Sequence, residues 1–394
     1  MRRKNAWTTY NKKQLDELEK LCKNYLKFLD KGKTERECVK QIVKQAEEKG
    51  YVNLADITKD KKALKAGDKV YSVCMDKTVA LFQIGKKKLE KGMNILGAHI
   101  DSPRMDVKQN PLYESEEFVY LDTHYYGGIK KYQWVTLPLA LHGVVVKKDG
   151  TVITVNVGED KNDPVFCVTD LLIHLAGEQM EKKANKVIEG ENLDVLVGSK
   201  PLEGKEKDAV KEGILEILKE KYDMTEEDFM SAEIEVVPAG HAREAGLDHS
   251  MVMSYGQDDR VCAYTSLAAM LEVEEVEKTT CCLLTDKEEI GSVGATGMQS
   301  RFFENSVAEL MDAMGEFSEL SLRRCLANSS MLSSDVNAAY DPLFANAFEK
   351  NNASYFGRGV VFSKFTGSRG KSGSNDANAE YLSLIHISEP TRPY

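Results

Sequence analysis

The chain has 394 residues, of which 42% are hydrophobic and 29% charged, a balance typical of soluble globular proteins. Its 53 basic and 63 acidic side chains give a formal charge of −10, which argues against a nucleic-acid partner because phosphate binding needs a basic surface. No apolar run approaches the roughly 18 residues of a membrane span, and no apolar segment follows the basic N-terminus as in a secretory signal. The composition predicts a cytoplasmic protein of two or three domains with no membrane partner.

The eight cysteines agree with that compartment. None lies in a Cys-x-x-Cys pair, and several occupy apolar runs such as residues 281–284. Small buried thiols in a reducing compartment explain this distribution better than a cysteine-rich zinc site.

The first part of the chain alternates between helical and strand patterns. Apolar residues at three- and four-residue steps predict a helix over 15–29. A second helix is expected to begin after Thr34, whose hydroxyl can form a capping box with Glu37. The segment 68–84 is typical of a β-hairpin, and the apolar run 93–101 is typical of a buried strand whose carboxyl end faces a site.

The middle of the chain has a different pattern of predicted strands and helices. Short strands at 144–147 and 152–157 precede a charged stretch and a helix over 208–221. The α/β pattern then returns, with a strand over 279–284 and a helix over 305–317. We therefore expect a catalytic domain interrupted by an insertion. The expected boundaries are 1–101 for the first part of the catalytic domain, 102–240 for the insertion and 241–381 for the second part.

Four short polar segments stand at or near the ends of apolar stretches. They are His99-Ile100-Asp101, Gln257-Asp258-Asp259-Arg260, Asp286-Lys287-Glu288-Glu289 and Ser334-Asp335. Taken singly, each is more often a core histidine, a helix cap or surface charge. Taken together, they supply a histidine, three acids, a spare glutamate and an orienting aspartate, in the order typical of a two-metal hydrolase.

The spacing inside two of these segments has a chemical meaning. Residues i and i+2 of a strand point to the same face, so the Asp101 carboxylate can orient the His99 imidazole. Of the adjacent glutamates, one carboxylate can bind a metal while the other takes a proton from water, provided that the backbone turns there. Gly291 and Gly294 permit such a turn.

These segments, together with Tyr126-Gly127-Gly128-Ile129, resemble the aspartyl aminopeptidase and vacuolar aminopeptidase I family of zinc metallopeptidases, in particular its bacterial members. The resemblance implies an α/β fold, with a mixed-sheet α/β/α metallopeptidase catalytic domain and an inserted β-rich oligomerisation domain. It also implies two Zn²⁺ per subunit, with Mn²⁺ or Co²⁺ as alternatives. The implied partners are a peptide substrate and further copies of the chain, which assemble as dodecamers in the family.

The resemblance also implies a role for each residue. The implied metal ligands are His99, Asp258 as the bridging carboxylate, Glu289 and Asp335. Asp101 would orient the site, and Glu288 would be the general base in the attack of a water shared by the two metals. The expected reaction is the removal of single N-terminal residues from peptides.

The chain departs from the family pattern after Tyr381. The family's last metal ligand is a histidine in a C-terminal strand, and no such segment follows here. Residues 382–394 instead resemble a translated sequencing adaptor. We therefore expect the second part of the catalytic domain to be incomplete and these residues to be a non-native tail.

Substrate preference and two alternatives stay open from the sequence. Lys364, Arg369 and Lys371 lie in a basic, glycine-rich segment that the family places near the substrate, and they could pair with an acidic side chain. One alternative is a related two-metal hydrolase that acts on another amide, such as an acylamino acid. The other is a catalytically inactive oligomeric scaffold.

Overall fold

The computed structural model describes residues 4–365 and 376–388. The chain divides into two compact units, residues 24–335 and residues 1–23 with 336–394. The larger unit contains both six-stranded sheets and all the expected metal ligands. Within the described ranges, no helix combines the length and apolarity needed to cross a membrane.

The first sheet of the larger unit is mixed, with the strand order β1-β2-β3-β13-β4-β14. Its strands are β1 (Val52–Asn53), β2 (Lys69–Cys74), β3 (Thr78–Gln83), β4 (Asn94–His99), β13 (Thr280–Thr285) and β14 (Ser330–Ser333). Strands β2 and β3 form the predicted antiparallel hairpin. Strands β13 and β14 both run parallel to β4, so the carboxyl ends of these three strands meet at one edge of the sheet.

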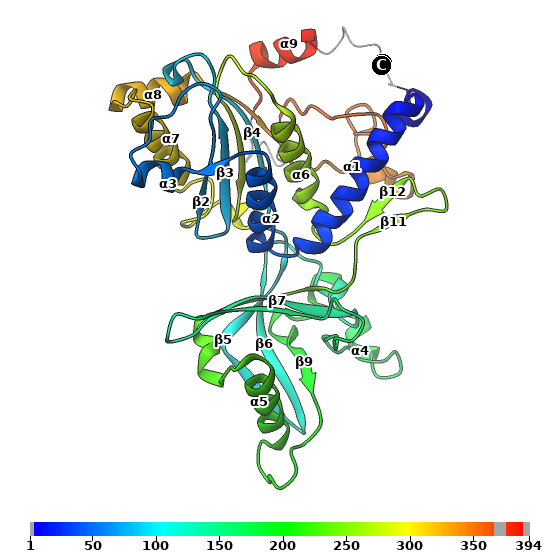
Figure 1. Ribbon diagram of the computed structural model, residues 1–394. Coiled ribbons are helices and arrows are strands. Elements are labelled where there is room, and N and C mark those ends of the chain that lie inside the picture. The colour runs from blue at the N-terminus through cyan, green and yellow to red at the C-terminus, as the bar shows by residue number, and fades with distance from the viewer. Residues whose placement is uncertain (1–3, 366–375, 389–394) are drawn as a thin grey trace. The chain divides into compact units, whose positions relative to one another are not determined.

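Helices cover both faces of this sheet (Figure 1). One face packs against the end of α1 (Lys12–Lys31), α2 (Glu35–Glu48) and α6 (Gln257–Glu272). The other packs against α3 (Leu54–Lys59), α7 (Phe302–Ala313) and α8 (Glu319–Ala327). The period-two alternation of strand side chains divides them between the two cores, so Cys282 and Leu284 of β13 face α6 while Cys281 and Leu283 face α7. This α/β/α sandwich confirms the predicted fold class.

Local signals in the sequence account for the helix ends. The capping box at the start of α2 is confirmed, because the Thr34 hydroxyl accepts from the Glu37 N–H and the Glu37 carboxylate accepts from the Thr34 N–H. Helix α7 ends at Ala313, four residues before the predicted end, because Gly315 takes a left-handed conformation with φ of 68°.

The second sheet lies between residues 104 and 238 and is antiparallel, with the order β8-β7-β10-β5-β6-β9. Its strands are β5 (Arg104–Ser115), β6 (Phe118–Tyr126), β7 (Leu139–Val146), β8 (Val152–Val157), β9 (Val195–Gly198) and β10 (Ala232–Pro238). It has its own apolar core, partly covered by α5 (Ala209–Tyr222). The short helix α4 (Gly177–Met180) precedes β9, and the two-stranded sheet of β11 (Arg243–Ala245) and β12 (Met251–Met253) follows β10.

The smaller unit consists of the N-terminal residues and the segment that begins at Val336. Its described contacts include a hydrogen bond from the Ala6 N–H to the Gly357 carbonyl, and the rings of Phe348 and Tyr355 against that of Tyr340. Helix α9 spans Ala379–Ser388.

A buried histidine links the second sheet to helix α2. His142 of β7 is 1% exposed and lies between two carboxylates, with Nδ1 2.9 Å from Glu37 of α2 and Nε2 3.1 Å from Glu159. Lys33 also faces Glu159, at 3.6 Å. Burial by itself lowers the pKa of His142, but the hydrogen bonds to Glu159 and Glu37 outweigh it and raise that pKa. The two carboxylates therefore favour the imidazolium form of His142 in the folded protein.

This arrangement predicts a pH-dependent contribution to stability. Because the folded-state pKa of His142 is raised, its contribution is complete below about pH 6.5, the usual pKa of histidine, and is lost as the pH rises through the folded-state value. We expect His142→Gln to lower the free energy of unfolding by about 1–3 kcal/mol near pH 6 and by less at higher pH. Thermal unfolding of the two proteins between pH 5 and 9 measures this difference. His249→Gln, at an exposed histidine, is the control; a difference that is constant with pH would contradict the assignment.

Candidate metal centre

The candidate site lies where strand ends of the first sheet meet the start of α6. His99 is the last residue of β4, and Asp335 follows β14 by two residues. Glu288 and Glu289 open a short 3₁₀-helix (Glu288–Ile290) after β13. Asp258 and Asp259 lie in the first turn of α6, where the backbone is not yet helical and the peptide bond between them is cis. The parallel pairing of β13 and β14 with β4 brings these segments together although they are far apart in the sequence.

Two groups of side chains lie close enough to hold a metal ion. His99, Asp258 and Glu289 form one group, and His99, Asp259 and Asp335 form the other, with one ligand atom of each residue within 4.8 Å of the others in its group. The Nε2 atom of His99 lies 3.3 Å from an Asp258 oxygen and 4.0 Å from an Asp335 oxygen. All four residues expected as ligands are therefore in one cluster, with His99 common to both groups.

Asp259 is a member of this cluster to which the sequence assigned no role. Its side chain is fully buried, and neither carboxylate oxygen has a hydrogen-bond partner among the described residues. The Cys262 thiol lies near it but outside hydrogen-bond geometry. Burial raises the pKa of Asp259 to about 7. A buried carboxylate without a donor is costly unless a proton or a cation neutralises it, so this residue fits a metal site.

The electrostatics of the cluster also favour a cation. Burial lowers the pKa of His99, but the hydrogen bonds to Asp101 and Asp258 outweigh it and raise this pKa to about 11 in the absence of metal. Burial and the neighbouring Asp258 raise the pKa of Glu289 to about 7, and burial also raises that of Glu288. These carboxylates repel one another and attract positive charge, and imidazole with carboxylates is a donor set that zinc accepts.

Asp101 contacts both His99 and the turn that carries the two glutamates. Its side chain is fully buried. His99 Nδ1 is hydrogen-bonded to the Asp101 backbone carbonyl at 3.0 Å and lies 3.3 Å from one carboxylate oxygen. The same carboxylate accepts hydrogen bonds from the backbone N–H groups of Glu288 and Glu289, at 3.1 and 3.2 Å, and from the Tyr126 hydroxyl at 2.7 Å. A single aspartate therefore orients the histidine and the turn that carries both glutamates.

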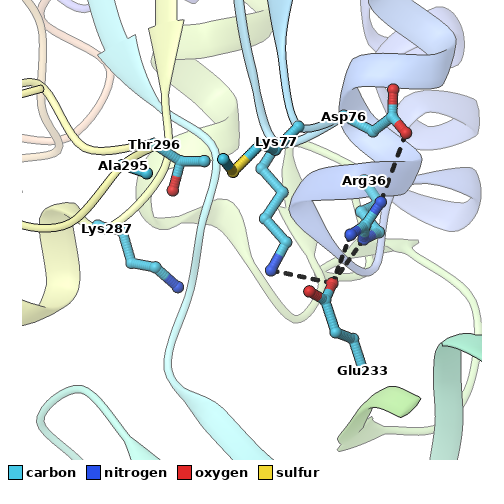
Figure 2. Close-up of a pocket in the computed structure, with 8 residues that line it drawn as sticks. Arg36, Asp76, Lys77, Glu233, Lys287, Ala295 and Thr296 are labelled. Carbon is cyan, nitrogen blue, oxygen red and sulfur yellow. Dashed lines mark hydrogen bonds and ion pairs between the residues drawn. The ribbon is translucent and has the colours of Figure 1, made fainter. Parts of the chain in front are cut away.

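A pocket of about 420 Å³ lies beside this region and contains none of the candidate ligands (Figure 2). Figure 2 shows Arg36 of α2 and Lys77 of the β2–β3 turn converging on Glu233 of β10. The Lys77 ammonium lies 3.0 Å from the Glu233 carboxylate, and Arg36 contacts the same carboxylate at 2.6 Å and Asp76 at 3.5 Å. These ion pairs connect the second sheet to α2 and to the β2–β3 turn. Because the basic groups are already paired with acids, the pocket is a poor site for an anionic substrate.

The basic residues expected near the substrate are placed only in part. Lys364 is exposed and belongs to the smaller unit, where its carbonyl accepts a hydrogen bond from the Ala377 N–H. Arg369 and Lys371 lie outside the described residues. The substrate-binding role of these three residues stays a prediction.

Comparison with known proteins identifies the family. A profile of the family described as aminopeptidase I zinc metalloprotease (M18) matches residues 28–389. This chain belongs to the M18 family. The probable M18 family aminopeptidase 1 of Clostridium acetobutylicum is 61% identical over 383 residues, which cover 97% of this chain and 82% of that protein.

Two crystal structures of M18 proteins share the fold. The M18 aminopeptidase of Thermotoga maritima superimposes with a TM-score of 0.92 at 44% identity and covers 98% of this chain and 84% of its own. Aminopeptidase I of Clostridium acetobutylicum gives a TM-score of 0.88 at 58% identity, with coverage of 98% and 83%. The predicted family and the assignment of the chain to zinc aminopeptidases are confirmed.

Proposed function

We propose that this M18 protein is a two-zinc aminopeptidase that removes single N-terminal residues from peptides, with Glu288 as the general base. The observation that carries the proposal is the cluster at the strand ends. His99, Asp258, Asp259, Glu289 and Asp335 provide two groups of ligand atoms, each group within 4.8 Å. Two adjacent cation sites beside an additional glutamate are the arrangement that a two-metal hydrolase requires.

The proposal assigns the ligands as follows. His99, Asp258 and Glu289 would hold one ion, Asp335 would hold the other, and Asp258 would be the bridging carboxylate. Asp259 is an additional ligand candidate for the ion at Asp335, because its buried oxygens have no other partner in the described chain. When bound, the zinc ions would polarise the scissile carbonyl and lower the pKa of the attacking water. Mn²⁺ or Co²⁺ could occupy the same donor set.

Glu288 is suited to move the proton. Its side chain is 47% exposed, so that water and substrate can reach it, and its nearer oxygen lies 3.8 Å from His99 Nε2. Burial raises its pKa, and a carboxylate with a raised pKa is a stronger base than an ordinary one. In the proposed reaction Glu288 takes a proton from the attacking water and donates it to the nitrogen of the leaving peptide. Asp101 holds the backbone from which Glu288 projects.

Two finer parts of the proposal concern substrate and assembly. An acidic N-terminal residue is the proposed preferred substrate, through Lys364, Arg369 or Lys371. Self-association is supported by the exposed apolar residues Leu171, Leu172, Ile173 and Leu175. The structurally similar yeast protein mApe1 is described as a dodecamer, with a TM-score of 0.68 and 21% identity to this chain. We extend that assembly to this chain as a proposal.

Hydrolysis of short peptides tests the proposed function. We expect the zinc-loaded protein to release the first residue from peptides with a free amino terminus, and to lose this activity on treatment with a chelator and regain it when zinc is restored. Peptides that begin with Asp, Glu or Leu measure the side-chain preference. N-acetylated copies of the same peptides are the control, and cleavage of these alone would favour the acylamino acid reading.

A further inference from the structure

The Asp101 carboxylate is held by residues of both sheets. Asp101 follows β4 of the first sheet, and three of its contacts come from this sheet's own segments: the His99 imidazole and the N–H groups of Glu288 and Glu289. The fourth contact is the hydroxyl of Tyr126, at 2.7 Å, and Tyr126 is the last residue of β6 in the second sheet. It is the shortest hydrogen bond that Asp101 accepts among the described residues.

The ring of Tyr126 is itself fixed. Arg104 is its direct partner across the β5–β6 ladder, and the guanidinium carbon lies 3.8 Å from the ring centroid. Arg104 is 3% exposed and pairs with Asp106 at 2.8 Å and with the buried Glu35 and Glu235 at 3.4 and 3.3 Å. These ion pairs leave the guanidinium little freedom, so the phenol ring beneath it has a defined position and its hydroxyl points at Asp101.

Directly after Tyr126 the chain packs closely against Glu289, a candidate metal ligand. Gly127 has φ of 75°, and a Cβ atom placed there would lie 3.2 Å from Glu289 Cβ and 3.4 Å from a Glu289 oxygen. The end of β6 thus contacts Asp101 through the Tyr126 hydroxyl and packs against Glu289 through Gly127.

We infer that Tyr126 is a positioning residue for the metal centre, through which the second sheet sets the orientation of Asp101. The hydroxyl donates to the carboxylate that lies beside His99 and accepts from the backbone N–H groups of both glutamates. Without this donor the Asp101 carboxylate keeps only the two backbone N–H donors, and the Glu288–Glu289 turn and the His99 imidazole beside it are positioned less precisely. This inference rests on the proposed function, because it assumes that the cluster binds metal.

Tyr126→Phe tests the inference, because it removes the hydroxyl and keeps the ring under Arg104. We expect its zinc affinity to fall 10–100-fold, the size of effect usual for a partner of a metal ligand's hydrogen-bond network. We also expect kcat to fall with KM little changed, because Tyr126 is buried and its hydroxyl donates to Asp101. Zinc affinity is measured by competition with a chromophoric chelator, and the melting temperature of the metal-free protein is recorded beside it.

Tyr125→Phe is the matched control, since it makes the same change one residue earlier on the opposite face of β6. We expect it to bind zinc as the wild type does. Gly127→Ala is a second variant, and we expect it to weaken zinc binding by displacing Glu289. Wild-type zinc affinity and kcat in Tyr126→Phe would overturn the inference alone. A wild-type protein that binds no zinc would overturn both the inference and the proposed function.

Discussion

Replacing Glu288 by Gln is expected to reduce kcat by about 10²–10⁴-fold and to leave zinc binding intact. The amide has nearly the shape of the carboxylate but cannot accept the proton of the attacking water. Glu288 is not in either group of ligand atoms, so its loss removes no member of the metal site. Single-turnover hydrolysis of a peptide and zinc content per chain, measured on the same preparation, check both parts of the expectation.

Glu289→Gln is the matched partner of this variant. It makes the same chemical change one residue later, at a residue that belongs to the group with His99 and Asp258. We expect Glu289→Gln to lose zinc affinity first and activity as a consequence, so that excess zinc restores part of its turnover. Excess zinc should not restore Glu288→Gln. If the two variants behave alike, or if Glu288→Gln keeps more than about a tenth of wild-type turnover, Glu288 is not the base.

Replacing His99 by Ala is expected to abolish peptide hydrolysis and zinc binding at the site that His99 shares with Asp258 and Glu289, because this site loses its only imidazole. The readout is the effect of zinc on thermal stability. A ligand at one hundred times its dissociation constant stabilises the native state by about 2.7 kcal/mol, and this zinc-dependent increase should vanish in the variant. His249→Ala is the control, because that histidine is 70% exposed and pairs only with Glu244 among the described residues. A persistent increase in His99→Ala would show that the carboxylates bind zinc without the imidazole.

Much of the secondary structure followed from local signals in the sequence. The capping box at Thr34 and the hairpin over 68–84 depend on residues within a few positions of one another, and both are present. The apolar run that ends at His99 is strand β4, buried because helices cover both faces of its sheet. Helix α7 ends before the predicted residue 317, because the backbone turns into the left-handed region at Gly315.

The sequence by itself determined the family and nominated the residues that are proposed to carry the chemistry. A histidine and carboxylates in short polar segments after apolar runs, in the order of a two-metal hydrolase, were enough to nominate the cluster and the family. The nomination was possible because buried strands are apolar and polar groups follow their carboxyl ends, a relation that is visible in one dimension.

Only the tertiary structure decided which additional residues lie against the candidate site. Asp259 looked like a helix-cap neighbour, and its burial without a hydrogen-bond partner appears only when α6 is packed against the strand ends. Tyr126 lies 25 positions from Asp101, and the hydrogen bond between them exists because a second sheet returns its strand β6 to the start of β5. The physical reason is that hydrogen bonding and desolvation depend on distances in space, and residue spacing predicts these within one element but not between two sheets.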